Sequence, residues 1–242
     1  MDALTQEIVG GQLLPGEMLP READLAQRFG VSRGVAREGI RAMEERGLIS
    51  VRHGRGATVN ELSAWNTLDP DVLGPLLAGP YRVDVLEDYM EARRILEVEA
   101  AGLAAERARE EDLAAMRRAL AAMEQAATGS ATRATEERFH EADIAFHQAL
   151  IGGTRNRALC SLTESIHAAV LTTRFWLARP EYRLERAMPE HRAILAAVVA
   201  GDPAAARAAM SAHLATVESY ITAHNGARPS GGAGSNGDRA SD

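Results

Sequence analysis

Residues 82–224 follow a helical pattern almost throughout, and this long run limits the chain to a fold built mainly from packed helices. Helix-breaking or polar residues interrupt the pattern at five places: Arg109-Glu110, Thr128-Gly129, Gly152-Gly153, Arg179-Pro180 and Gly201-Asp202-Pro203. The interruptions divide the run into about six helices, at most seven. Since short connections join antiparallel neighbours, we predict a mainly α protein with a C-terminal antiparallel all-α bundle.

The composition excludes several classes of protein. Aromatic residues make up 4% of the chain, which disfavours a β-sandwich. Cys160 is the single cysteine, so the chain is not a disulfide-stapled secreted domain. The longest apolar stretch, residues 193–200, is too short to span a membrane, and the first residues lack the pattern of a signal peptide. We therefore expect a cytoplasmic protein without a membrane partner.

Changes in composition divide the chain into four segments. Residues 1–62 combine short helical patterns with a stretch rich in glycine, valine and arginine. Residues 63–81 contain three prolines and two glycines and are predicted to form a linker with at most one short helix. Residues 82–224 form the predicted bundle, and residues 225–242 are rich in glycine and serine, which predicts a disordered tail.

Positive charge is concentrated near the front of the chain. The whole chain carries a net charge of −7, and all 27 basic residues are arginines. Residues 20–59 hold eight arginines and five acidic residues, a net charge of +3, which leaves −10 on the rest. A small basic region on an acidic body is compatible with local binding of nucleic acid.

The basic region has the pattern of a winged helix-turn-helix. Residues 22–29 suit a short helix that ends at a glycine, and residues 33–46 suit a second helix with Ser32 as its N-cap. Two short strands follow, and they enclose a turn of basic and glycine residues that is typical of a wing. The turn contains His53, Gly54 and Arg55.

The second of these helices carries a line of arginines. Arg33, Arg37 and Arg41 are spaced four residues apart and therefore share one side of a helix. Such a helix fits the major groove of DNA, where arginine binds guanine edges or phosphates, and Ser32 is placed to donate a hydrogen bond to a phosphate. The alternative is a solvated face in which Arg41 pairs with Glu44 or Glu45.

Four residues of the helical run form a candidate metal site. Asp143 and His147 are four residues apart, so their side chains leave the same face of one helix, and His191 and His213 share their register with apolar residues of later helices. Together they would suit a divalent ion such as Zn, Ni, Co, Mn or Fe(II). The alternative is that these histidines are hydrogen-bonded core residues. His140 is a competing candidate, which we interpret as solvated or adjacent to the ligands.

The first 60 residues resemble the GntR family of winged-helix bacterial regulators. The matching string is PGEMLPREADLAQRFGVSRGVAREGIRAMEERGLISVRHGRGATV. The resemblance implies that Arg33 and Arg37 contact bases or nearby phosphates, and that His53 and Gly54 of the wing reach the minor groove. It also implies a homodimer on a palindromic operator.

The helical run resembles the effector-binding domain of the FadR-like subfamily, in the strings EARRILEVEAAGLAAERA, DIAFHQALIGGTRN and EHRAILAAVVAGDPAAARAAMSAHL. The resemblance implies four metal ligands: Asp143, His147, His191 and His213. It further implies a small carboxylate effector at the metal, which pairs with Arg93. The alternative for Arg93 is an ion pair with Glu97, and Arg94 is the lesser candidate. We interpret Glu97, Glu99 and Glu106 as solvated charges or groups adjacent to the ligands.

Taken together, the sequence predicts a DNA-binding transcriptional repressor that responds to a small organic acid bound at a metal. Two alternatives are a metal-dependent enzyme of the helical-bundle type and a regulator that senses the metal itself. The enzyme is disfavoured because the sequence offers no obvious general base on the face of the metal ligands and leaves the arginine-lined helix unexplained.

Overall fold

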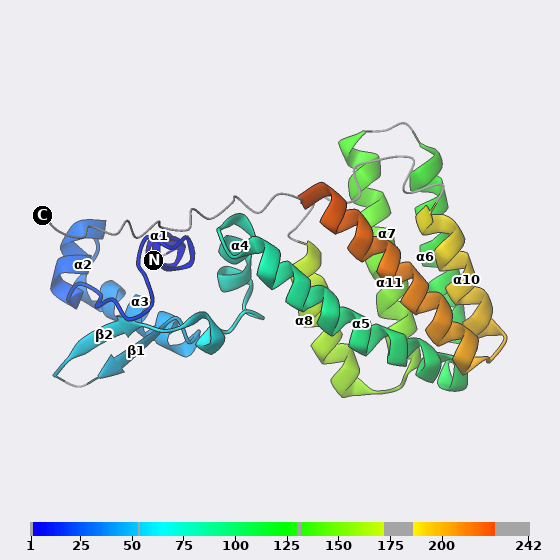
Figure 1. Cartoon of the computed structure of the whole chain (residues 1–242), viewed down its shortest axis with the longest axis horizontal. Helices are drawn as coiled ribbons and strands as arrows, with labels where there is room; N and C mark the ends of the chain where they lie inside the picture. Colours follow the sequence, from blue (N-terminus) through cyan, green and yellow to red (C-terminus); the bar gives the residue numbers. More distant parts are fainter. Residues whose placement is uncertain (1, 53, 130–131, 172–185, 226–242) are drawn as a thin grey trace, which may run out of the picture.

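The computed structural model of the chain describes residues 2–52, 54–129, 132–171 and 186–225. It is mainly helical, with a small winged helix-turn-helix at one end and a helical bundle at the other (Figure 1). This confirms the predicted fold class. His53 and all but the first residue of the predicted tail, residues 225–242, lie outside the described residues.

The helix-turn-helix consists of α2 (Glu22–Phe29) and α3 (Arg33–Glu45), preceded by α1 (Asp2–Val9). Gly30 ends α2 in the left-handed conformation, with φ of 64°. Ser32 begins α3, because its side-chain oxygen accepts a hydrogen bond of 3.3 Å from the Val35 N–H. The predicted cap is therefore confirmed, and α3 buries one face, consisting of Ala36, Gly39, Ile40 and Met43.

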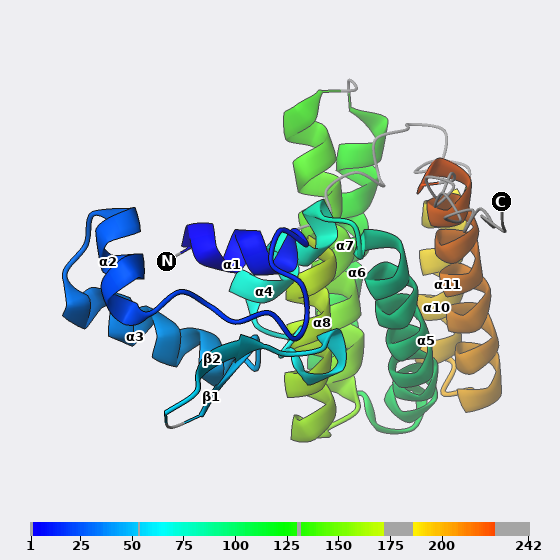
Figure 2. The same ribbon diagram turned by 60° about the vertical axis from the view of Figure 1, so that its left-hand side comes forward.

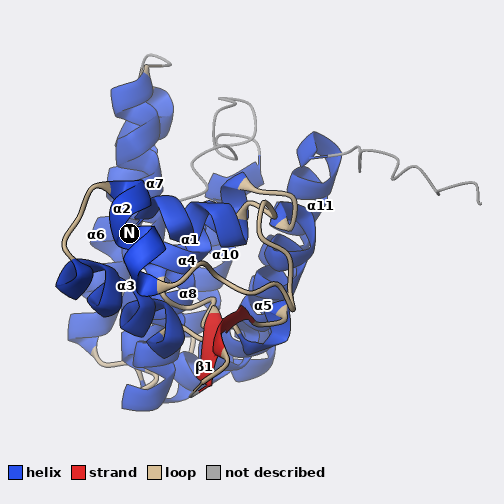
Figure 3. Ribbon diagram, turned by 90° about the vertical axis from the view of Figure 1, so that its left-hand side faces the viewer, coloured by secondary structure: helices blue, strands red, loops and turns tan. Residues whose placement is uncertain are grey.

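The wing is an antiparallel pair of strands, β1 (Ile49–Arg52) and β2 (Gly56–Val59), as predicted. Ile49 lies opposite Val59, and both are buried against the helices. Figure 3 views the molecule from this end and shows the strands beside α3. The wing therefore extends from the same side of the molecule as the arginine-lined helix.

Residues 62–78 contain a 3-10 helix, η1 (Leu62–Ala64), and the helix α4 (Pro70–Ala78). Asp69 caps α4 by accepting a hydrogen bond of 2.9 Å from the Asp71 N–H. The buried face of α4 consists of Val72, Leu73 and Leu76. These side chains belong to a hydrophobic cluster that includes residues of α1–α3, Val85 and Tyr89 of α5, and Ile166 of α8. This cluster therefore joins the winged end to α5 and α8 of the bundle.

The described helices of the bundle agree with the predicted breaks. They are α5 (Arg82–Arg107), α6 (Glu110–Thr128), α7 (Arg133–Gly153), α8 (Arg157–Leu171), α10 (Met188–Val199) and α11 (Pro203–Asn225). The long helices run side by side, with α6 against α7 and α5 against α11 (Figure 2). The predicted break at Arg179-Pro180 lies outside the described residues.

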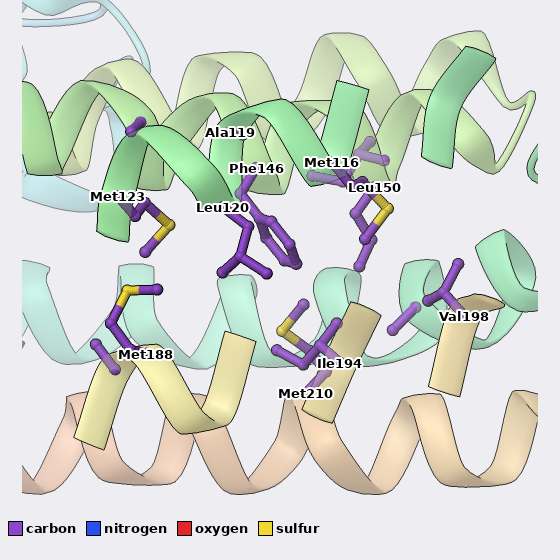
Figure 4. Packing of buried hydrophobic residues seen from close by; sticks show 14 of the residues in the cluster. Met116, Ala119, Leu120, Met123, Phe146, Leu150, Met188, Ile194, Val198 and Met210 are labelled. Carbon is purple, nitrogen blue, oxygen red and sulfur yellow. The ribbon is translucent and has the colours of Figure 1, made fainter. Parts of the chain in front are cut away.

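The bundle core is built largely from methionine, aliphatic and alanine side chains, with two fully buried phenylalanines, Phe139 and Phe146. Figure 4 shows Phe146 of α7 packed between Leu120 of α6 and residues of α10 and α11. The small side chains of Ala100, Ala101 and Ala104 let α5 approach its neighbours closely. Among the described helices, none is both long enough and apolar enough to cross a lipid bilayer.

Candidate functional site

Four side chains from three helices converge inside the bundle. Asp143 and His147 come from α7, His191 from α10 and His213 from α11. One donor atom of each lies within 4.8 Å of the others. The three imidazoles are buried, and the carboxylate of Asp143 is largely so. The sequence placed only Asp143 and His147 on one face, and the packing of the three helices completes the cluster.

Each imidazole has a carboxylate or carbonyl oxygen from outside the cluster within 3.0 Å of its Nδ1 atom. Nδ1 of His147 lies 2.5 Å from the Glu97 carboxylate, and Nδ1 of His213 lies 3.0 Å from that of Glu190. Nδ1 of His191 lies 2.7 Å from the carbonyl oxygen of Ala187. A metal-binding histidine is usually oriented in this way, because the outer acceptor fixes the tautomer and leaves Nε2 for the ion.

The contact between His191 and Asp143 fits a cation at the centre of the cluster. The Ala187 carbonyl can only accept a hydrogen bond, so the Nδ1 atom of His191 carries a proton. Its Nε2 atom lies 2.9 Å from Oδ1 of Asp143. If Nε2 carries no proton, its lone pair faces the carboxylate oxygen, and the two atoms repel each other. A proton or a metal ion between them removes this repulsion. Adjacent ligands of an octahedral ion, each about 2.1 Å from it, are about 3 Å apart.

The protonation states also suit a metal. Burial lowers the pKa of the His147 and His213 imidazoles, which favours their neutral, metal-binding form at neutral pH. Burial alone would raise the pKa of Asp143, but the neighbouring His191, His147 and Arg93 side chains hold that pKa well below its usual range, so the carboxylate is ionised. The cluster therefore offers three imidazole nitrogens and a carboxylate, a donor set that borderline divalent ions accept.

The arginine line of α3 lies on an exposed side of the helix, next to its buried face. Arg33, Arg37 and Arg41 all lie on the surface of α3. Arg41 also donates to Glu45 at 3.2 Å, so the ion pair named as an alternative is present for that residue. Two exposed side chains at 69% and 68% accessibility form a weak pair, which DNA can displace.

At the tip of the wing, Gly54 adopts φ of 75°, and the N–H of Arg55 donates to the carbonyl oxygen of Arg52 at 2.9 Å. A left-handed residue at this position favours glycine, which explains the tight turn. Gly54 and Arg55 are exposed, next to β1 and β2. The third predicted wing residue, His53, lies outside the described residues.

Comparison with known proteins agrees with this arrangement. The family model "Bacterial regulatory proteins, gntR family" matches residues 1–59, and the model "FCD domain" matches residues 88–216. The galactonate operon transcriptional repressor of Escherichia coli K12 is 34% identical, covering 85% of this chain and 88% of that one. The chain belongs to the GntR family and carries an FCD domain.

Two further comparisons support the assignment. The regulator LutR of Bacillus subtilis 168 is 32% identical to this GntR-family chain, covering 90% of this chain and 97% of LutR. The solved structure of Lar, which controls the agr system of Listeria monocytogenes, superposes with a TM-score of 0.61. It shares 23% identity and covers 93% of this chain and 94% of that one, so it supports the fold. The GntR-family chain is thus a DNA-binding transcriptional regulator, and its relatives are regulators rather than enzymes.

Of the two interpretations of Glu97, a solvated charge or a group adjacent to the ligands, the structure confirms the second. Glu97 is fully buried, and its two carboxylate oxygens lie 2.5 Å from Nε of Arg93 and 2.5 Å from Nδ1 of His147. The alternative of an ion pair between Arg93 and Glu97 is therefore confirmed. Arg93 is buried as well, and it lies close enough to Asp143 to lower the pKa of that carboxylate. Glu97 thus links the arginine to a histidine of the cluster.

Glu190 is a residue that the sequence analysis did not identify. It accepts from Nδ1 of His213 at 3.0 Å and from Oγ1 of Thr216 at 2.7 Å. In the sequence, the only sign of its role is that it stands directly before His191. Consecutive residues of a helix point about 100° apart, so on α10 the two side chains contact different partners. His140, the competing histidine, is half-buried on α7 and is not part of the four-residue cluster.

Proposed function

We propose that this regulator represses transcription as a cytoplasmic homodimer, and that a small hydroxycarboxylic acid bound at a divalent metal in the FCD domain controls its affinity for operator DNA. The observation that carries the proposal is the convergence of four donor atoms within 4.8 Å, with an outer acceptor at Nδ1 of each imidazole. A core of merely structural histidines would not need four mutually facing donors.

The metal would be held by Asp143, His147, His191 and His213. When bound, such an ion supplies a Lewis acid that attracts anionic oxygen ligands. The donor set accepts Zn, Ni, Co, Mn or Fe(II), since imidazole and carboxylate suit all of them. In an octahedral ion, four protein ligands leave two adjacent or opposite positions for an effector.

The chemical class of the effector follows from these positions and from a relative. The related repressor of Escherichia coli is named for a galactonate operon, and galactonate is a hydroxycarboxylic acid. An acid of this class offers a carboxylate and a neighbouring hydroxyl, which can fill two adjacent positions. Arg93 would pair with the carboxylate, because a guanidinium binds carboxylates through two parallel hydrogen bonds and Arg93 is already held next to the cluster by Glu97.

The route from this cluster to the DNA would run through α5 and α4. Arg93 and Glu97 belong to α5, and Tyr89, one turn earlier, donates from its hydroxyl to the carbonyl oxygen of Thr67 at 2.6 Å. Arg46, directly after α3, contacts Asp69 at 3.1 Å and also Asp71. A shift of α5 would therefore be transmitted to α3, and by linkage the acid and the operator change each other's affinity by the same factor.

The test uses the full-length protein and an operator selected from a random DNA pool. Metal content is measured by elemental analysis, and operator affinity by fluorescence anisotropy for metal-free protein, metal-loaded protein, and metal-loaded protein with D-galactonate or L-lactate. His147→Ala should abolish metal retention, whereas His140→Ala, a matched change on the same helix, should retain it.

We expect an acid to change operator affinity at least fivefold, and only in metal-loaded protein. A well-folded protein that retains no divalent ion after incubation with Zn, Ni or Mn salts would overturn the metal site. If the metal alone changes operator affinity and no acid adds to the effect, the metal itself is the signal.

A further inference from the structure

The first turn of α3 contains an exposed valine that the fold does not need. Val35 is 49% exposed, although Ala36, Ile40 and Met43 on the other side of the helix are buried. A β-branched residue is also a modest helix former, so its presence on the surface of a helix does not stabilise α3. Val35 lies two residues from Arg33 and two from Arg37 in the exposed first turn of α3, on another side of the helix, and it is available for a contact outside this chain.

Gly34 precedes this valine, and the fold does not require glycine there either. A Cβ atom at position 34 would meet Oγ of Ser32 at 3.7 Å, an ordinary contact, and no other atom within 4 Å. The φ angle of Gly34 is not positive, so the backbone at this position does not require glycine. Glycine inside a helix costs about 0.5–1 kcal/mol relative to alanine. A glycine at this exposed position leaves room for another molecule to approach the backbone closely.

These two residues share one turn with Ser32 and Arg33, and Arg37 follows on the next turn. In helix-turn-helix proteins the N-terminal residues of the second helix contact base edges in the major groove. The apolar group displayed there is the C5 methyl of thymine. An exposed valine beside a bare glycine backbone complements a methyl group that must come close to the helix.

We propose that Val35 contacts the C5 methyl group of a thymine in each operator half-site, and that Gly34 provides the space for this approach. The inference rests on the proposed placement of α3 in the major groove. It adds that one thymine of each half-site is recognised, and that Val35, which has no charge and no hydrogen-bonding group, determines this specificity.

The test replaces thymine by deoxyuridine, which removes only the methyl group. DNA sites are first selected from a random pool with the full-length wild-type protein, and each thymine of the selected half-site is then replaced in turn. For one thymine, replacement should weaken wild-type binding about fourfold per half-site, the effect of losing one buried methyl group. Binding is measured by fluorescence anisotropy at fixed salt.

Val35→Ala should bind the thymine and the deoxyuridine sites equally well. This variant is expected to fold, because the side chain is half exposed and alanine favours a helix. Ile95→Ala is the matched control: Ile95 is also a β-branched residue exposed on a helix, at 61%, but it lies on α5 in the bundle. This control should keep the full preference for thymine.

Gly34→Ala separates recognition from folding. It should raise or maintain the melting temperature and yet weaken binding to the selected site at least fivefold. Three results would overturn the inference: a selected site insensitive to every thymine replacement, a thymine preference that survives in Val35→Ala, or unchanged affinity in Gly34→Ala. Enrichment of no DNA sequence by the wild-type protein would instead overturn the proposed operator binding itself.

Discussion

At the residue scale, the histidine cluster is defined by its outer acceptors as much as by its inner donors. Glu97, Glu190 and the carbonyl of Ala187 each place an oxygen next to the Nδ1 atom of one histidine. The Nε2 atoms of the three histidines are therefore left to face the centre of the cluster. Such outer acceptors affect metal affinity, because they set the tautomer and raise the basicity of the ligand. The site therefore extends to α5, which carries none of the four proposed ligands.

Glu97→Gln should lower metal affinity about 10- to 100-fold, because the amide is a weaker acceptor for His147. It should also destabilise the protein by about 3 kcal/mol, since the charge of the buried Arg93 loses its partner. Glu99→Gln is the matched control, because Glu99 lies on the same helix but is 63% exposed beside Arg207. Competition with a chromophoric chelator measures the affinity, and equal affinities for the two variants would contradict the prediction.

Acid should destabilise the metal-free protein. The unfolded chain protonates its histidines near pH 6.5, whereas burial lowers the pKa of His147 and His213 in the folded chain. The unfolded state therefore binds more protons as the pH falls below 6.5, and the free energy of unfolding decreases in that direction. Asp143, with its lowered pKa, adds the same trend below about pH 4.

We expect the melting temperature of chelator-treated protein to fall steadily from pH 7.5 to about pH 5. His213→Gln, which removes one of these buried imidazoles, should show a shallower decline over the same range. A melting temperature independent of pH in the wild-type protein would show that the imidazoles are not held in their neutral form.

At the scale of elements, α4 is the piece that joins the two functional ends. Its N-terminal carboxylates bind Arg46 at the end of α3, and its apolar face lies in the same cluster as Tyr89 of α5 and Ile166 of α8. Gly47, between α3 and β1, has φ of 73°, and the backbone of Ala64, the last residue of η1, packs directly against it. Because α3 and η1 meet there without a side chain between them, their spacing is fixed by backbone contacts.

Gly47→Ala should therefore destabilise the winged end strongly, by more than about 3 kcal/mol. A Cβ atom at this position would clash with the carbonyl oxygen of Ala64, and the left-handed backbone adds strain. Gly152→Ala on α7 is the control: a Cβ atom there meets nothing within 4 Å, so stability should rise by up to about 1 kcal/mol. Urea unfolding measures both, and equal stabilities would contradict this account.

At the scale of the whole molecule, the basic DNA-binding surface and the buried histidine cluster lie far apart. The arginine-lined helix and the wing lie at one end, and the bundle with its buried cluster lies at the other (Figure 1). The rest of the chain carries a net charge of −10, since the whole chain carries −7 and residues 20–59 carry +3. The acidic body should repel DNA that approaches from any side except the winged end.

Operator affinity should therefore fall steeply with salt, and the slope should depend on the arginines of α3. Arg37→Ala should reduce the slope of log K against log salt concentration by about 1 per protomer, between about 50 and 200 mM salt. Arg118→Ala, an exposed arginine on α6 of the bundle, should leave the slope unchanged. Equal slopes for the two variants would show that Arg37 does not contact the DNA.

The local elements, the N-cap at Ser32, the wing and the pairing of Asp143 with His147 could be predicted without the fold, because they depend on residues a few positions apart. Tertiary packing alone decided that His191 and His213 meet that pair, that Glu97 is buried beside Arg93, and that α4 belongs to a core shared by the two ends. The physical reason is that helical periodicity fixes the face on which a side chain lies. Which helices then face one another depends on how the bundle excludes water from all of its apolar faces at once.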